Sequence, residues 1–159
     1  MSVERAKPAD LPRILDIQRK AFGQYSSRID TEPWLGETLE ELEADSREKT
    51  ILVAKDENGT PVGSVRFMTV EGVVFVRKIS VDPDVQGHGA GRALIEALER
   101  SVPPEAHKIF LCTLLRTERN IPFFLSLGYR PESLMPDHYR HADLICFGKH
   151  LNPRDTGNR

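Results

Sequence analysis

The chain has 159 residues, with a hydrophobic fraction of 39% and a charged fraction of 29%, which suits one domain with a single core. Its formal net charge of −2 excludes the basic footprint of general nucleic-acid binding, so we expect no nucleic-acid partner. No apolar run approaches the length of a membrane span, and no signal-peptide core follows Met1. Cys112 and Cys146 both lie in apolar runs, so we expect two buried thiols and a cytoplasmic protein.

The first element that the sequence predicts is a short strand, Ser2–Lys7, followed by a helix. Asp10 is the expected N-cap of this helix, and Pro12 is tolerated because it falls in the first turn. Helical spacing predicts that one stripe of the helix is buried, and its members are Ile14, Ile17 and Ala21. A polar connection from Gly23 to Pro33 then leads to Trp34.

A second helix is predicted over Leu35–Ser46, with Leu35, Leu39 and Leu42 on one face. Acidic residues cover the rest of this helix, namely Glu37, Glu40, Glu41, Glu43 and Asp45. Two interpretations of these residues stay open. They form a solvated face, or they attract a cationic ligand.

An antiparallel hairpin is predicted next, with strands at Thr50–Lys55 and Pro61–Val70. Its turn is Glu57-Asn58-Gly59, and Asn-Gly is a strong turn signal. Glu71-Gly72 predicts a second turn, which leads into the central strand.

The central stretch Val73–Arg100 joins a strand, a glycine-rich turn and a helix without a break. Val73–Val81 is apolar and β-branched, as a buried strand requires. Gly91–Arg100 has helical spacing, and its apolar residues are Leu94, Ile95 and Leu98, with Val102 beyond them. A helix that begins at a glycine-rich turn presents backbone N–H groups and the positive end of its dipole, and together these bind phosphate.

The glycine spacing restricts which anion binds at Gln86-Gly87-His88-Gly89-Ala90-Gly91. A dinucleotide fingerprint requires a third glycine where Arg92 stands, and a P-loop requires a Gly-Lys-Ser/Thr ending that is absent. The stretch, preceded by Val81-Asp82-Pro83, resembles the acyl-CoA pyrophosphate loop of the GNAT superfamily of N-acetyltransferases. The alternative is a tight turn in which the glycines serve backbone geometry alone.

The last third of the chain predicts a strand, a helix and a final strand. His107–Leu115 is expected to lie parallel to the central strand, because a strand–helix–strand unit is right-handed. Thr117–Leu127 is predicted as a helix that ends at Gly128-Tyr129. Ala142–His150 is predicted as the last strand, and 152–159 as a frayed tail.

A second stretch, Asn120 to Tyr129, resembles the GNAT helix that flanks the thiol end of CoA. The resemblance implies that Asn120 hydrogen-bonds the pantetheine amides. It also places Phe124 where the family commonly has a tyrosine that protonates the departing thiolate. A phenylalanine has no proton to give, so Tyr129, Tyr139 or a water is left for that role. CoA is nevertheless a fair leaving group as the thiolate, because a thiol has a pKa of about 8.5.

The general base is not assigned, because the central strand carries no acid and Glu71 and Asp82 lie only at its ends. The oxyanion of the transition state is expected to accept a backbone N–H near Ile79–Val81. No metal is expected. The candidate ligands are Asp137, His138, His141 and His150, and histidines at this spacing in a polar stretch without cysteines are a weak metal-binding pattern.

The resemblance therefore implies a mixed α/β fold with a central, twisted, mostly antiparallel sheet of six to seven strands. It has a parallel pair at the acyl-CoA site and helices on both faces, within one domain over 1–151. The implied activity is direct transfer of the acetyl group of acetyl-CoA to an amine of a small molecule or peptide. Expected cofactor-binding residues are Ile79, Ser80, Val81, Gln86, Gly87, His88, Gly89, Ala90, Gly91, Arg92, Asn120 and Phe124.

The expected catalytic candidates are Tyr129, Tyr139 and Glu71. The expected partner is an amine acceptor, with no membrane partner, and the protein is a monomer or a homodimer. The connection before the second helix would then either line the acceptor pocket or be a surface loop, and the acidic helix would attract a cationic amine acceptor or be a solvated face. The competing hypothesis is an acyl-CoA-binding sensor without turnover, which Phe124 and the missing strand acid favour.

Overall fold

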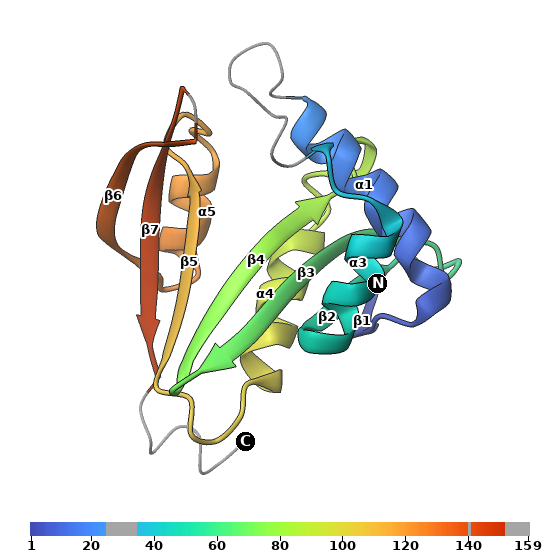
Figure 1. The fold of residues 1–159 in the computed structure, drawn as a ribbon, viewed down its shortest axis with the longest axis horizontal. Helices are drawn as coiled ribbons and strands as arrows, with labels where there is room; N and C mark the ends of the chain where they lie inside the picture. The colour runs from blue at the N-terminus through green and yellow to red at the C-terminus, as the bar shows by residue number, and fades with distance from the viewer. Residues whose placement is uncertain (25–34, 140, 152–159) are drawn as a thin grey trace. The chain divides into compact units, whose positions relative to one another are not determined.

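A computed structural model describes residues 1–24, 35–139 and 141–151. The connection from Gly23 to Pro33, Trp34 and the tail 152–159 were assigned from the sequence, and nearly all of these residues lie outside the described part. One seven-stranded sheet runs in the order β1-β2-β3-β4-β5-β7-β6, which confirms the predicted mixed α/β class (Figure 1). The chain divides into two compact units, Met1–Met68 with Arg77–Ser101 and Thr69–Val76 with Val102–Arg159, and each is described by itself.

The strands of the first unit are antiparallel neighbours. β1 (Ser2–Arg5) pairs with β2 (Thr50–Lys55), and β2 pairs with β3 (Pro61–Val70), both as the sequence predicts. In the hairpin turn Gly59 has φ +79°, and the Asp56 carboxylate accepts the N–H groups of Asn58 and Thr60 at 2.9 Å each. The Asn-Gly turn is therefore confirmed.

Helices α1 (Leu11–Gly23) and α3 (Leu39–Glu48) pack on one face of β2. Their shared core consists of Leu11, Ile14, Leu15, Leu42, Ile51 and Val53. The predicted start of the second helix at Leu35 is wrong. A break follows Leu35, and Thr38 caps α3 by accepting the Glu41 N–H at 3.2 Å while the Glu41 carboxylate accepts the Thr38 N–H. This reciprocal capping box satisfies two amides that have no partner inside the helix.

Helix α4 (Ala90–Ser101) covers the opposite face of these strands, and Gly63 lets it approach closely. Gly63 pairs with Ala54, whose side chain lies on the opposite face of the sheet from those of Ile51 and Val53. A Cβ at this glycine would stand 3.0 Å from the Ser80 carbonyl oxygen and 3.2 Å from Leu94 Cδ1. The predicted stripe of Leu94, Ile95 and Leu98 is fully buried.

In the second unit, the start of β4 (Val73–Val81) pairs in parallel with β5 (Lys108–Leu114), as predicted. β5 is antiparallel to β7 (Ala142–His150), which is antiparallel to β6 (Arg130–Tyr139). β6 is absent from the sequence-based assignment. It is an edge strand that contains Pro131 and Pro136, its side chains are mostly exposed, and its register shifts twice. Helix α5 is Asn120–Ser126, three residues shorter at its start than predicted.

The expectation of two separate thiols is wrong, because Cys112 and Cys146 form a disulfide. The two cysteines are directly opposite in the β5–β7 pairing, with their Cα atoms 4.0 Å apart. Their spacing of 34 residues along the chain does not show this, since the opposition depends on the register of two distant strands. The cytoplasmic location, which rested in part on free thiols, stays a prediction.

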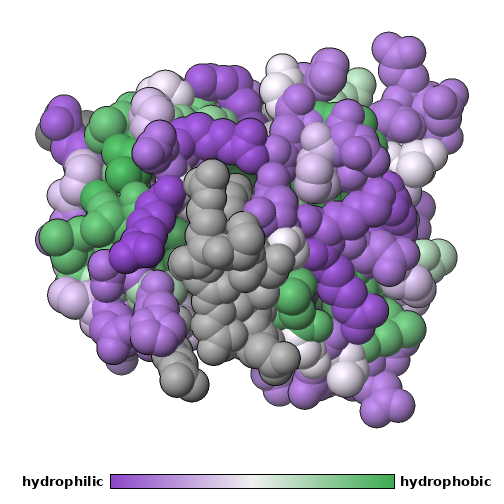
Figure 2. Space-filling model, turned by 90° about the horizontal axis from the view of Figure 1, so that it is seen from above, coloured by the Kyte–Doolittle hydropathy of each residue, from purple (hydrophilic) through white to green (hydrophobic). Residues whose placement is uncertain are grey.

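Hydrophilic side chains cover most of the face seen in Figure 2. Among the described residues, no helix has the length and apolar character needed to cross a membrane.

Candidate functional site

The glycine-rich loop is anchored at its start by Asp82, which is only 3% exposed. The Asp82 N–H donates to the Val62 carbonyl at 2.8 Å, and its carboxylate accepts the Asp84 N–H at 3.1 Å. Arg13 on α1 donates to the same carboxylate at 2.6 Å. Burial raises the pKa of Asp82, but the Asp84 N–H and the charges of Lys20 and Arg13 outweigh it, so the pKa is lowered. Asp82 therefore ties the end of β4 to β3 through its backbone N–H and to α1 through its carboxylate.

The loop itself exposes its backbone. Gly87 has φ +87° and Gly89 has φ +86°, conformations that side-chain-bearing residues rarely adopt. A Cβ built at either glycine meets no atom within 4 Å, so the space in front of the loop is open. α4 begins directly after the loop, and its first backbone hydrogen bond runs from Ala93 N to Gly89 O at 3.0 Å. The amides that start α4 therefore lie beside an open backbone surface, as an anion site requires.

The other loop residues differ in their surroundings. Gln86 Nε2 donates to the Val81 carbonyl at 3.2 Å, which closes the loop onto the end of β4. His88 is exposed, and its Nδ1 donates to the Val85 carbonyl at 3.1 Å. Ala90 is buried, whereas Arg92 is exposed and lies 3.8 Å from Glu96. In this loop the side chains thus shape the turn, and the backbone faces outward.

β4 contains a residue in the left-handed region, Lys78, which has φ +46°. A left-handed residue inside a strand breaks the pleat and re-aims the residues that follow, as in a β-bulge. The residues that follow are Ile79, Ser80 and Val81, all expected from the sequence to bind the acyl donor. Ser80 is buried, with its Oγ 3.5 Å from the Ser64 Oγ.

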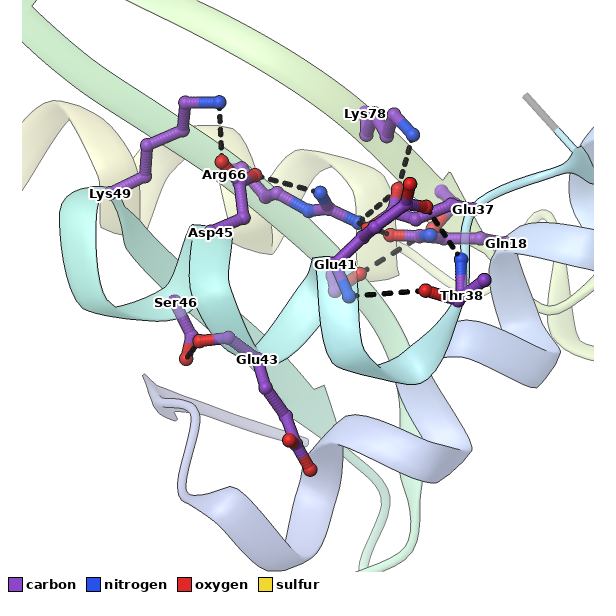
Figure 3. A network of polar contacts seen from close by, with 12 residues as sticks. Gln18, Glu37, Thr38, Glu41, Glu43, Asp45, Ser46, Lys49, Arg66 and Lys78 are labelled. Carbon is purple, nitrogen blue, oxygen red and sulfur yellow. Dashed lines mark hydrogen bonds and ion pairs between the residues drawn. The ribbon is translucent and has the colours of Figure 1, made fainter. Parts of the chain in front are cut away.

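A buried polar cluster lies on the α1 and α3 side of β3, and we call it the Arg66 network (Figure 3). Its members are Gln18, Glu37, Asp45, Lys49, Arg66 and Lys78. Arg66 donates to Asp45 at 2.8 Å and to the Gln18 side-chain oxygen at 2.5 Å, and its Nη2 lies 2.8 Å from Glu37 Oε1. Lys78 donates to Glu37 from β4.

This network corrects the interpretation of the acidic second helix. Glu37 precedes α3 and points inward to Arg66 and Lys78, and Glu41 is used in the capping box. Asp45 is paired with Lys49 and Arg66. Burial raises its pKa, but the hydrogen bonds from those two cations outweigh it, so the pKa is lowered. Three of the five acids are therefore engaged within the protein.

Three buried atoms of the network have no hydrogen-bond partner among the residues that the structure describes: Gln18 Nε2, Glu37 Oε1 and Arg66 Nε. Glu37 Oε1 lies within ion-pair distance of Arg66 but outside hydrogen-bond geometry. Sequence patterns did not signal this network, since Arg66 falls at an ordinary strand position and Gln18 on a helix.

In the second unit, Asn120 begins α5 and donates from Nδ2 to Thr113 Oγ1 at 2.8 Å. Phe124, by contrast, is 2% exposed and packs in an aromatic core with ring centroids 5.6 Å from Phe147 and 6.1 Å from Tyr129. Tyr129 is equally buried. Its ring lies below Lys149 Nζ, 5.4 Å from the centroid.

The other two catalytic candidates lie in exposed or half-buried places. Glu71 is in the turn before β4, so the whole strand separates it in the chain from the loop after β4. Tyr139 ends β6, with its ring edge-on to His138 at 4.8 Å. Within the described ranges, no group of three or more histidine, cysteine or acidic side chains is placed to hold a metal ion.

Comparison with known structures finds the same fold in several acetyltransferases. The ribosomal-protein-alanine N-acetyltransferase of Brucella melitensis is 24% identical, with a TM-score of 0.77 over 95% of this chain and 100% of that one. An N-acetyltransferase of Staphylococcus aureus Mu50 is 19% identical, with a TM-score of 0.77 over 95% and 98%. yncA of Salmonella typhimurium, solved with its cofactor acetyl-CoA, is 24% identical, with a TM-score of 0.73 over 96% and 94%.

No curated protein matches the sequence. The family model described as "Acetyltransferase (GNAT) family" matches residues 11–129, which include β4, the glycine-rich loop, α4 and α5. The chain therefore belongs to the GNAT acetyltransferase family.

Proposed function

We propose that the protein is an N-acetyltransferase that passes the acetyl group of acetyl-CoA directly to an amine of a small molecule or peptide. The observation that carries the proposal is the loop at Gly87 and Gly89, whose left-handed backbone opens onto free space at the start of α4. Membership in the acetyltransferase family supports acetyl transfer as the chemistry.

In this proposal the amides of the loop and of the first turn of α4 bind the pyrophosphate of acetyl-CoA. A helix start suits this group because its dipole and its N–H donors both favour negative charge. Asp82 acts at a distance, by holding the loop to β3 and α1. Gln86 acts in the same way through its bond to Val81. The pantetheine arm is assigned to the backbone of Ile79–Val81, and the role of Asn120 toward it stays a prediction from the sequence.

The transfer begins when the lone pair of the acceptor nitrogen attacks the thioester carbonyl carbon. A backbone N–H of Ile79–Val81 would hold the resulting oxyanion, which then expels the CoA thiolate as the carbonyl re-forms. The acceptor nitrogen loses its proton to solvent or a base that we do not assign. No acid is needed in principle, since the leaving thiol has a pKa of about 8.5. Holding both reactants in place supplies about 7–11 kcal/mol of the barrier reduction.

A sensor that binds acyl-CoA without turnover is the second candidate. Phe124 favours it, because this ring stands where the family commonly places a proton-donating tyrosine and is here packed against Phe147 and Tyr129. The sensor and the enzyme share the loop and differ only in whether an acceptor is used.

A thiol-release assay separates the two candidates. Purified protein is mixed with acetyl-CoA and a panel of amines that includes polyamines, amino acids and a peptide with an N-terminal alanine. The alanine peptide is chosen because one structural neighbour is a ribosomal-protein-alanine N-acetyltransferase. An enzyme frees CoA faster with one acceptor than without, and mass spectrometry finds that this acceptor carries one added acetyl group. Calorimetric binding of acetyl-CoA with no release in any mixture would favour the sensor.

A further inference from the structure

The left-handed conformation of Lys78 inside β4 requires a cause in the surrounding structure. A residue with a side chain rarely adopts φ +46° inside a strand, and such conformations persist only where neighbouring contacts over-determine them. Just beyond β4, the Asp82 N–H donates to the Val62 carbonyl of β3 at 2.8 Å. The left-handed residue thus lies between the start of β4 and a bond that ties the chain to β3 just before the loop.

The contact that restrains Lys78 is its ion pair with Glu37. The Glu37 side chain is 9% exposed, and Lys78 is 25% exposed, so water screens their attraction only in part. Both residues belong to the first unit, which also contains the glycine-rich loop.

Glu37 is itself held by a rigid support. Arg66, at 3% side-chain exposure, lies 2.8 Å from one Glu37 oxygen and is fixed on its other side by Asp45 at 2.8 Å. Gln18 accepts from the same Arg66 nitrogen. Figure 3 shows Glu37 between the Arg66 guanidinium and the Lys78 ammonium, with the two cations arriving from neighbouring strands. A carboxylate that is held by a cation on each side is a good anchor.

We propose that Glu37 is a positioning residue that holds Lys78 in its left-handed conformation and so aims the backbone of Ile79–Val81 at the acetyl-CoA thioester. The inference rests on the proposed function, because it assumes that this part of β4 binds the acyl donor. It assigns Glu37 a role through Lys78 and no contact with substrate.

A double-mutant cycle tests the proposal. Glu37→Gln removes the anchor charge, and Lys78→Gly replaces the strained residue by one that adopts positive φ without help. Calorimetry measures the affinity for acetyl-CoA and for adenosine 3′-phosphate 5′-diphosphate, the part of CoA that carries no pantetheine. The fragment reaches the loop but not Ile79–Val81, so it reports on the loop alone.

The proposal expects Glu37→Gln to weaken acetyl-CoA binding about tenfold, because the left-handed conformation is unfavourable for a residue whose side chain has lost its anchor. Fragment affinity should stay unchanged. In the Lys78→Gly background the same substitution should change acetyl-CoA affinity by less than about twofold, since glycine no longer needs the anchor.

Two control variants separate positioning from general stability. Asp56→Ala removes the carboxylate that accepts two N–H groups in the β2–β3 turn and contacts neither Glu37 nor Lys78, so it should lower the melting temperature and leave acetyl-CoA affinity unchanged. Glu40→Gln neutralises an exposed neighbour and should change neither.

The inference would be overturned if Glu37→Gln weakened acetyl-CoA binding equally in the wild-type and Lys78→Gly backgrounds. It would also be overturned if the fragment lost as much affinity as acetyl-CoA, or if acetyl-CoA affinity did not change. If the wild-type protein binds acetyl-CoA but the effect of Glu37→Gln does not depend on residue 78, the inference is overturned and the proposed function stands. A wild-type protein that binds no acetyl-CoA overturns the proposed function as well.

Discussion

The glycine-rich loop can be tested by comparing two glycines that share one backbone conformation. Gly89 has φ +86° in the loop before α4, and Gly59 has φ +79° in the β2–β3 turn. A Cβ meets nothing within 4 Å at either position. Aspartate at each site therefore carries a similar cost to folding, but only Gly89→Asp places a carboxylate where the pyrophosphate must approach.

The expected size of the effect follows from these conformations. A side-chain-bearing residue in a left-handed conformation costs about 1–2 kcal/mol, so both variants should lose about that much unfolding free energy. The added charge acts only on the ligand. Two like charges about 4 Å apart repel by about 1 kcal/mol in water and about 4 kcal/mol at a protein surface. We therefore expect acetyl-CoA to bind Gly89→Asp at least about tenfold more weakly, which is about 1.4 kcal/mol.

Calorimetry with acetyl-CoA measures this loss, and denaturant unfolding measures stability in parallel. Gly89→Asn has nearly the shape of Gly89→Asp without its charge, so the difference between the two variants isolates electrostatic repulsion. The reasoning is refuted if Gly89→Asp binds as well as Gly59→Asp, or if the asparagine and aspartate variants bind equally well. Weaker binding at low salt than at high salt in Gly89→Asp would add support, because screening reduces the repulsion.

Three further predictions concern stability and rate. Asp82→Asn should lose about 1–3 kcal/mol of unfolding free energy at neutral pH. Because the folded pKa of Asp82 is lowered, the wild-type advantage is complete above the unfolded value of about 3.9 and disappears as the pH falls through the folded pKa, as urea titrations across pH would show. Phe124→Tyr should lose about 1–3 kcal/mol by burying a hydroxyl in the aromatic core. Thiol release should not gain the roughly 10²–10⁴ of general acid catalysis, and such a gain would contradict the placement of this ring. Reduction of Cys112–Cys146, which closes 34 residues, should cost about 2–4 kcal/mol in denaturant unfolding, and two titratable thiols in the native protein would contradict the disulfide.

Elements with a local signal could be predicted closely. Val73–Val81 and Ala142–His150 have the predicted bounds, because a β-branched or apolar run between turn residues is enough to define a buried strand. The positive φ of Gly87 and Gly89 likewise agrees with a loop that requires glycine. The start of α3 had a readable signal that the apolar spacing masked: Thr38 followed three residues later by Glu41 is a capping box.

Other features depend on contacts between distant segments. β6 has no alternating apolar pattern, because as an edge strand it buries little on either face. The disulfide follows from the β5–β7 register, and the Arg66 network brings together residues that are up to sixty positions apart, from Gln18 to Lys78. No single stretch of sequence contains the information for either feature.

Gly63 affects the position of the glycine-rich loop because it has no side chain. Helix α4 begins at Ala90, directly after Gly89 of the glycine-rich loop, so the height of this helix above the sheet also sets the height of the loop. A Cβ at Gly63 would stand 3.2 Å from Leu94 Cδ1 and 3.0 Å from the Ser80 carbonyl oxygen, so α4 lies at its present height because this Cβ is missing. A single methyl group at position 63 would act as a wedge under α4 and tilt the turn, although it lies in β3. A substitution at a residue such as Gly63, which lies under the loop and contacts no ligand, can therefore change the affinity for the ligand of the proposed function.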